Sequence, residues 1–321
     1  MKAALKRGAL LAAANWPLVI VQFVAGSVFK LLLAVPIVGG AFLVALLLDT
    51  NLTDLLSGDA RDIVTSILAA LVASPVALAA FIASAFIVLV GGSLLTFIVK
   101  GGTVALLAES ERIAGPIDRP PLRFESLRRA AVVSIEPFIE GCRRLWRRYV
   151  RIGIGLLIAY ALTAVIYLAV VFGGYALAQN SAILLGWTAA TAVASSVLIV
   201  WITLLNFFYL MTQMVVAIED VSVRRGVALA LAFVWGHLRE VAGVFGVVLI
   251  TVVIATAASI LATAGLGLIA FVPLVGLAVL PLQLAAWLVR GIVFEYLALA
   301  ALGAYLSHYR WYHSSSDIRV A

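Results

Sequence analysis

Long runs of apolar residues constrain this chain more than any other feature of its sequence. Stretches of 20 to 40 residues with almost no charge flank a polar, arginine-rich segment at 100–151. Only a bilayer accommodates such runs, because about 20 apolar residues in a helix span the ~30 Å hydrocarbon core. Hydrophobic residues make up 65% of the chain and charged residues 12%, whereas about a quarter of the residues of soluble domains are charged. The sequence therefore predicts an all-α, polytopic membrane helix bundle in a single integral domain, 1–321.

About six transmembrane helices fit the apolar runs. The predicted spans are 17–48, 75–99, 152–176, 187–218, 241–264 and 281–306. Pro75 divides a run that is too long for one upright helix, so 61–74 is expected to lie along the outer surface. The apolar stretch 265–280 contains Pro273 and is expected to be irregular and half-inserted, and 265–306 fits either one long helix or two shorter ones.

The distribution of basic residues predicts the orientation of the spans. Of 22 Lys and Arg, 19 fall in the four segments that this arrangement puts on one side, 1–16, 100–151, 219–240 and 307–321. Only Arg61 falls in an outer loop. Cytoplasmic loops of membrane proteins carry an excess of Lys and Arg. Both termini are therefore predicted to be cytoplasmic, in the inner membrane of a bacterium-like cell. The apolar run after the N-terminal basic residues is too long for a signal peptide, which indicates an uncleaved first helix.

Amphipathic surface helices are predicted before spans three and five. From Phe124 to Tyr149 apolar residues recur every three or four positions, and Pro137 should kink or divide this helix. Most of its arginines fall off the apolar stripe and are expected to contact anionic lipid headgroups. A docking surface for a cytoplasmic partner, such as an ATPase, is the alternative. These arginines are Arg128, Arg129, Arg143, Arg144, Arg147, Arg148 and Arg151.

The two predicted surface segments also resemble each other. Each starts with a similar pentapeptide, Ser-Leu-Arg-Arg-Ala at 126–130 and Ser-Val-Arg-Arg-Gly at 222–226. A duplicated unit of span, surface helix and span explains this, and so does chance, because only a few positions match.

Polar residues inside the predicted spans form the candidate site. An ionised side chain at the centre of a span costs roughly 2.5–3.5 kcal/mol on insertion scales, so it should face protein and find a partner. Counted from the cytoplasmic ends, Lys30 lies about 20 Å deep, Glu295 about 16 Å and Arg290 about 24 Å. Asn206 lies at about 18 Å. The four residues indicate either a polar pin that fixes helix register or a buried site for an anionic group or a proton.

Signs of an enzyme are missing from the sequence. No nucleophile elbow or phosphate-binding loop occurs, and His237, His308 and His313 lack the neighbours that a metal site needs. The single cysteine, Cys142, excludes an intrachain disulfide. We therefore expect no catalytic residue, metal site or cofactor. The net charge of +7 is explained by membrane orientation, so no nucleic-acid partner is expected.

Two stretches resemble a known family. VVAIEDVSVRRGVALALAFVWGHLREVAGVF at 215–245 and LGAYLSHYRWYH at 302–313 are similar to segments of a broad bacterial family of six-helix membrane proteins of mostly unassigned function. That group includes the membrane domain fused to some glycerophosphodiester phosphodiesterases, whose catalytic domain this chain lacks. The resemblance implies the six-helix architecture. Arg290 and Glu295 depart from the family's usual apolar last span.

Two classes of function follow from these observations. The first is a non-enzymatic module for transport, or for binding a lipid or small amphiphile, with its polar site around the residues inside the spans. The second is a structural or accessory subunit of a larger membrane complex. The expected partners are membrane lipids, with anionic headgroups at the cytoplasmic face, and other membrane subunits.

Overall fold

The chain is all-α throughout its described part, as predicted. The computed structural model describes residues 2–47, 74–118, 124–177, 181–270 and 275–320. These residues form nine helices and no strand. The helices are α1 (Lys2–Ala14), α2 (Trp16–Leu47), α5 (Pro75–Ile113), α6 (Phe124–Ala130), α7 (Ile135–Leu177), α8 (Ser181–Glu219), α9 (Val223–Gly236), α10 (Leu238–Ala270) and α11 (Val275–Val320).

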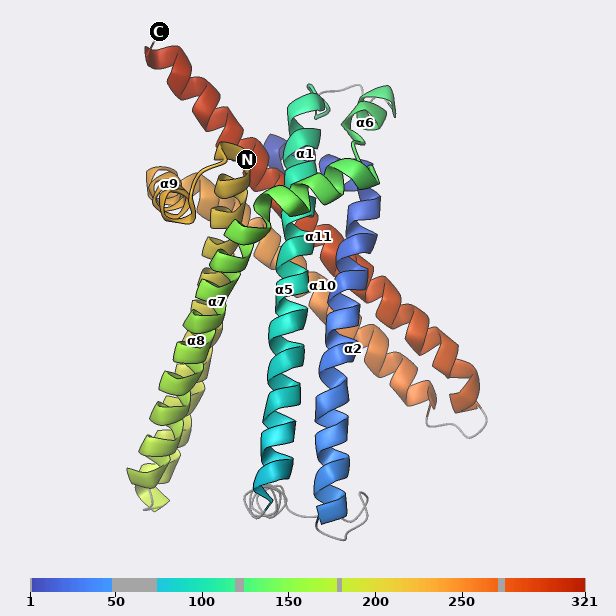
Figure 1. Cartoon of the computed structure of the whole chain (residues 1–321), viewed down its shortest axis with the longest axis vertical. Coiled ribbons are helices and arrows are strands. Elements are labelled where there is room, and N and C mark those ends of the chain that lie inside the picture. Colours follow the sequence, from blue (N-terminus) through green and yellow to red (C-terminus); the bar gives the residue numbers. More distant parts are fainter. Residues whose placement is uncertain (1, 48–73, 119–123, 178–180, 271–274, 321) are drawn as a thin grey trace.

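Six of these helices are long and apolar enough to cross a membrane, which confirms the predicted number of spans. They are α2, α5, α7, α8, α10 and α11. Consecutive helices pair into three hairpins, α2 with α5, α7 with α8, and α10 with α11. In Figure 1 the hairpins spread apart away from one shared end, where α1, α6 and α9 lie. The chain begins and ends on that same side, as an even number of spans requires.

Several boundaries differ from the predicted ones. Helix α5 continues through the predicted start of the basic segment to Ile113. The predicted surface helix is divided, but the break lies before Pro137: residues 124–130 form α6, residues 131–134 are not helical, and the remainder continues into span three as α7. Pro137 lies in the first turn of α7, where no backbone N–H is needed for an intrahelical hydrogen bond.

The stretch 265–306 belongs to two helices. Its first residues complete α10, which ends at Ala270, and α11 begins at Val275 and continues through Pro281. The prediction of an irregular stretch at 265–280 is therefore wrong for its described residues. Residues 271–274 lie outside the described part of the chain, as do 61–73, the greater part of the predicted outer-surface segment.

The three hairpins are joined in a cyclic order. Each hairpin is preceded by a shorter helical piece: α1 precedes the α2–α5 hairpin, the first turns of α7 precede the α7–α8 hairpin, and α9 precedes the α10–α11 hairpin. Each piece packs on the second helix of the preceding hairpin: α7 on α5, α9 on α8, and α1 on α11, which closes the circle. Helices α5, α8 and α11 also contact one another at the centre. We call this packed end, formed by the three short pieces and the parts of α5, α8 and α11 that they contact, the hub.

Two junctions repeat the same local geometry. Asn15 is the single residue between α1 and α2, and His237 is the single residue between α9 and α10. Each backbone N–H donates to the carbonyl oxygen four residues earlier, at 3.1 Å, and each side chain contacts the same oxygen. The two junctions therefore match α9 with α1, and the cyclic order also matches α9 with the first turns of α7, whereas the pentapeptides matched α9 with α6.

Small residues allow the close approach of helices in the hub. A Cβ on Gly8 of α1 would collide with the backbone of Ala300 and Ala304 in α11. Gly102 of α5 meets Gly141 of α7 in the same way. Short side chains let helix backbones approach in membrane proteins, where packing rather than the hydrophobic effect holds helices together. The buried core lies in this hub, whereas the hairpins beyond it expose apolar side chains, as lipid-facing helices do.

Candidate functional site

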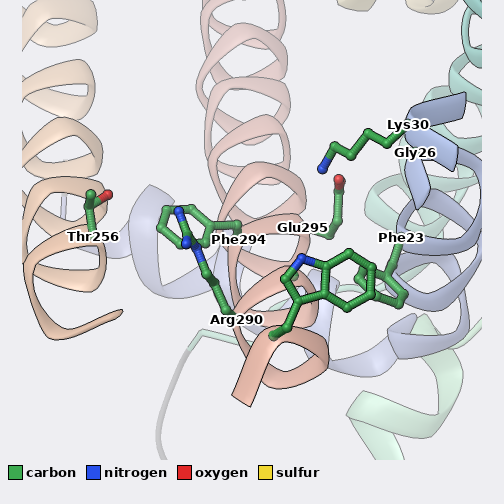
Figure 2. A pocket seen from close by; sticks show the side chains of 9 residues that line it. Phe23, Gly26, Lys30, Thr256, Arg290, Phe294 and Glu295 are labelled. Atoms are coloured by element: carbon green, nitrogen blue, oxygen red, sulfur yellow. The ribbon is translucent and has the colours of Figure 1, made fainter. Parts of the chain in front are cut away.

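A cavity of about 400 Å³ opens where the α2–α5 and α10–α11 hairpins begin to separate. Its size lies in the range of small-molecule sites, roughly 300–1,000 Å³. It receives side chains from α2, α10 and α11 (Figure 2). The lining residues are Phe23, Gly26, Lys30, Thr256, Trp287, Arg290, Gly291, Phe294 and Glu295.

Three of the four predicted site residues, Lys30, Arg290 and Glu295, line this cavity. Figure 2 shows the Lys30 amino group facing the Glu295 carboxylate, and the Arg290 side chain turned away toward Phe294 and Thr256. The Arg290 guanidinium carbon lies 5.8 Å from the Phe294 ring centroid. Gly26 lies beside the carboxylate, since a Cβ there would make an ordinary van der Waals contact with Glu295 Oε1 at 3.8 Å.

The fourth predicted residue, Asn206, belongs to a different part of the molecule. It lies on α8 and faces α7, where the Tyr160 hydroxyl donates a hydrogen bond of 2.6 Å to Asn206 Oδ1. Asn206 therefore links the two helices of the α7–α8 hairpin and contributes nothing to the cavity.

Lys100 is a cation near the site that the sequence reasoning missed. It lies on α5 and interacts electrostatically with Glu295, while its ammonium is 5.5 Å from the ring centroid of Tyr209 on α8. The prediction assigned Lys100 to a cytoplasmic segment because the apolar run ends at Val99. The helix continues, which puts Lys100 about 16 Å inside the bundle, counted from Glu111. The apolar residues of 103–108 carried this signal, since they extend the run beyond the lysine.

Charge in the cavity is not balanced. Lys30 and Arg290 share the cavity with one acid, Glu295, and Lys100 is a third basic residue nearby. Among the described residues, no ion pair within 4.0 Å involves any of these four side chains. Within the described part of the bundle, basic groups therefore outnumber acidic ones at this site.

A second charged cluster, in the hub, is balanced and fully paired. Arg7 of α1 lies 2.7 Å from Glu111 of α5 and 3.3 Å from Asp118. Arg310 of α11 lies 3.3 Å from the other oxygen of Glu111. The Arg7 and Glu111 side chains are only 10% and 6% exposed. Two cations and two acids that satisfy one another join three helices, so this cluster is structural.

The arginines predicted to meet lipid headgroups are mostly exposed, and they are placed on two helices. Arg128 and Arg129 end α6, and the others lie on the first half of α7. Among the described residues, only Arg148 of this set has an ion-pair partner, Asp220, at 2.5 Å. Six of these arginines are exposed to solvent or headgroups, namely Arg128, Arg129, Arg143, Arg144, Arg147 and Arg151.

The apolar stripe of the same segment is only partly buried. Leu145 and Tyr149 are fully buried against the hub, whereas Phe124 and Ile135 are 82% and 79% exposed. The second half of the stripe therefore packs on protein, and the first half remains available for a membrane surface.

Within the described ranges, no three His, Cys, Asp or Glu side chains lie close enough to hold a metal ion. His308 Nε2 lies 3.0 Å from Glu240 and stands beside the aromatic ring of Phe233 on α9.

Comparisons with protein-family models, with curated proteins and with solved structures find no match to this chain. The resemblance to the six-helix bacterial family therefore stays a prediction, and the candidate site rests on its own geometry.

Proposed function

We propose that this multi-pass membrane protein binds the anionic group of an amphiphile, a carboxylate or a phosphate, in the cavity between α2, α10 and α11. The observation that carries the proposal is the excess of basic over acidic groups in a cavity of ligand size, with no ion pair within 4.0 Å among the described residues. No catalytic step is part of it.

The cations supply the affinity for an anion. A hydrogen bond to a charged group contributes about 1.5–3 kcal/mol, and an unpaired charge inside an apolar bundle is costly. An anion between Lys30 and Arg290 would remove that cost. Figure 2 shows that the two side chains diverge, Lys30 toward Glu295 and Arg290 toward Thr256, and both line the cavity.

The aromatic lining suits the apolar body of such a ligand. Phe23, Trp287 and Phe294 surround the charged groups. Trp287 is 48% exposed, so the cavity reaches the apolar outer surface of the hairpins instead of being enclosed. An amphiphile can therefore enter from the bilayer with its charged group first.

Transport is a second candidate, and the depth of the cavity favours it. Glu295 lies fifteen residues before Arg310, and Lys30 lies fifteen residues after Asn15. At the helical rise per residue, Glu295 and Lys30 are therefore each about 22 Å from these hub residues. An anionic group bound there lies deep in the hydrocarbon region rather than at the hub surface. Binding at this depth is what a carrier needs in order to move a polar group between leaflets.

Native mass spectrometry of the protein purified in mild detergent tests the proposal. Three probes separate the possible sources of the anion: a long-chain fatty acid, phosphatidic acid, and phosphatidylcholine as the zwitterionic reference. The double variant Lys30→Met with Arg290→Met should bind the anionic probe at least about 100-fold more weakly, since two charge-assisted contacts are lost. Arg112→Gln is the matched control, because it removes one exposed charge outside the cavity.

A second variant separates binding from folding. Lys30→Met with Glu295→Leu replaces a cation and the acid together, so the net charge of the cavity stays the same. We expect this protein to keep the melting temperature of the wild type and to bind the anion more weakly than Glu295→Gln does, because it lacks the contact from Lys30. Unchanged binding of the anion in both double variants would refute the proposal. Recovery of a partner protein in place of an amphiphile would favour the accessory-subunit alternative.

A further inference from the structure

A separate groove runs along the α7–α8 hairpin, on other helices than the cavity described above. Its upper part is a cavity of about 240 Å³ between α7, α8 and α9. Ala159 lines this cavity and also a second one, of about 480 Å³, between α7 and α8. The two cavities are therefore neighbouring parts of one groove, which extends from Arg151 to Val170.

The groove has the length and lining of a lipid-chain site. Nineteen residues of helix separate Arg151 from Val170, or about 28 Å, close to the ~30 Å thickness of a hydrocarbon core. Both flanking helices belong to candidate membrane spans. Hydrogen bonds fix the hairpin beside the groove, from the Trp201 indole to Thr163 at 3.1 Å and from Tyr160 to Asn206 at 2.6 Å.

The charged end of the groove is the hub end. Arg151 is the one charged residue among the lining residues of both cavities, and it is exposed. In the described part of the chain Arg151 has no ion pair, whereas Arg148, one turn away, pairs with Asp220. Tyr209 lines the same cavity, and its buried hydroxyl lacks a hydrogen-bond partner among the described residues.

We infer that this groove holds one acyl chain of an anionic phospholipid, with its phosphate on Arg151. A chain fits because most residues that line the groove below Arg151 are apolar and the groove is open along the hairpin, so it receives its ligand sideways from the bilayer. A phosphate fits because a single free cation stands at the end of the groove that lies nearest the hub surface. The inference is independent of the anion site between α2, α10 and α11.

Gly155 provides a steric test of the groove. It lines the upper cavity, and a Cβ added there would meet no atom within 4 Å, so the fold should accept a larger side chain. Gly155→Leu should fill the groove and displace the chain. Gly246→Leu is the matched control, since Gly246 on α10 is equally open and lines neither part of the groove.

Arg151 provides a test of the headgroup. Arg151→Gln should lower the retention of phosphatidylglycerol about fivefold and leave phosphatidylcholine unchanged, as expected for one charge at a membrane surface. Arg147→Gln is the matched control, because Arg147 is exposed on the same helix, beside Trp146, and lines no part of the groove.

The readout is the number of lipids that each purified variant retains during stepwise removal of lipid, measured by native mass spectrometry with defined phosphatidylglycerol and phosphatidylcholine. The wild type should keep one phosphatidylglycerol after the loosely bound lipids are gone, and Gly155→Leu should lose it. Equal retention by the wild type, Gly155→Leu and Arg151→Gln would overturn the inference and leave only nonspecific boundary lipid. An equal loss in Arg147→Gln would also overturn it, because the effect would then come from general surface charge.

Discussion

Glu111 connects more elements than any other carboxylate in the hub cluster, because it accepts from Arg7 of α1 and from Arg310 of α11. Glu111→Gln should lower the free energy of unfolding by about 3–5 kcal/mol, since it leaves two arginines with Asp118 as the remaining acid. Thermal unfolding in detergent measures this. Glu109→Gln is the control: its partner Arg112 is 66% exposed, so a change below about 1 kcal/mol is expected. Equal melting temperatures for both variants would show that the cluster is not structural.

Glu295 contributes the negative charge in a cavity that we expect to receive an anion. Glu295→Gln keeps the shape of the side chain and removes that charge, so the anionic probe should bind at least roughly tenfold more tightly, because a like charge within about 12 Å costs about 1.4 kcal/mol or more at an effective dielectric constant near 20. Native mass spectrometry with a fatty acid and phosphatidic acid measures the change. Weaker binding would contradict the expected electrostatics and would mean that the carboxylate itself contacts the ligand.

Individual residues of the site were predictable to different degrees. A charge in an apolar run is visible in any sequence, and depth along the helix brought Lys30, Arg290 and Glu295 to one level, where the cavity lies. Depth does not say which way a side chain points around its helix. Asn206 therefore had the right depth but faces Tyr160 in another hairpin. Lys100 was missed because the end of the apolar run was mistaken for the end of the helix.

Helix α1 depends on a small residue where it crosses α11. Gly8→Leu should reduce stability by about 1–3 kcal/mol or more, because its side chain would meet the backbone of Ala300 and Ala304, which has little room to move. Gly246→Leu makes the same chemical change in open space on α10 and should be neutral. Melting temperatures of the two variants decide the matter. If both proteins melt together, α1 is not tightly packed on α11.

The sequence predicted the end of a helix correctly where a residue such as proline determines the backbone conformation. It missed the end of a helix where a continuous helix carries polar residues. Pro75 begins α5 as expected, because proline suits the first helical turn. Pro137 was expected to divide a helix, but it also lies in a first turn, since α7 begins only two residues earlier. Proline therefore starts a helix or breaks one depending on where the helix begins. The apolar pattern did not determine that boundary.

At the scale of the whole molecule, the number of spans followed from the sequence and their arrangement did not. Apolar residues surround the spanning helices on all sides, so no stripe identifies the face that meets a neighbour. The cyclic order of the hairpins depends instead on the short helical pieces and on small residues such as Gly8 and Gly141, whose partners lie far away in the sequence. A matching pentapeptide hinted at the repeat, but it equated α6 with α9.

The orientation of the bundle is a prediction of the basic residues, and cysteine labelling can test it. In a Cys142→Ser background, one cysteine replaces Ser57, which lies outside the described residues in the connection between α2 and α5. Another replaces Glu125, which is exposed on α6 at the hub end. Lys and Arg, far more than Asp and Glu, determine orientation, so neither substitution should invert the protein. A membrane-impermeant maleimide should label Ser57→Cys in intact cells, and Glu125→Cys only after permeabilisation. Labelling of Glu125→Cys alone in intact cells would reverse the orientation, and labelling of both would mean that α5 does not cross the membrane.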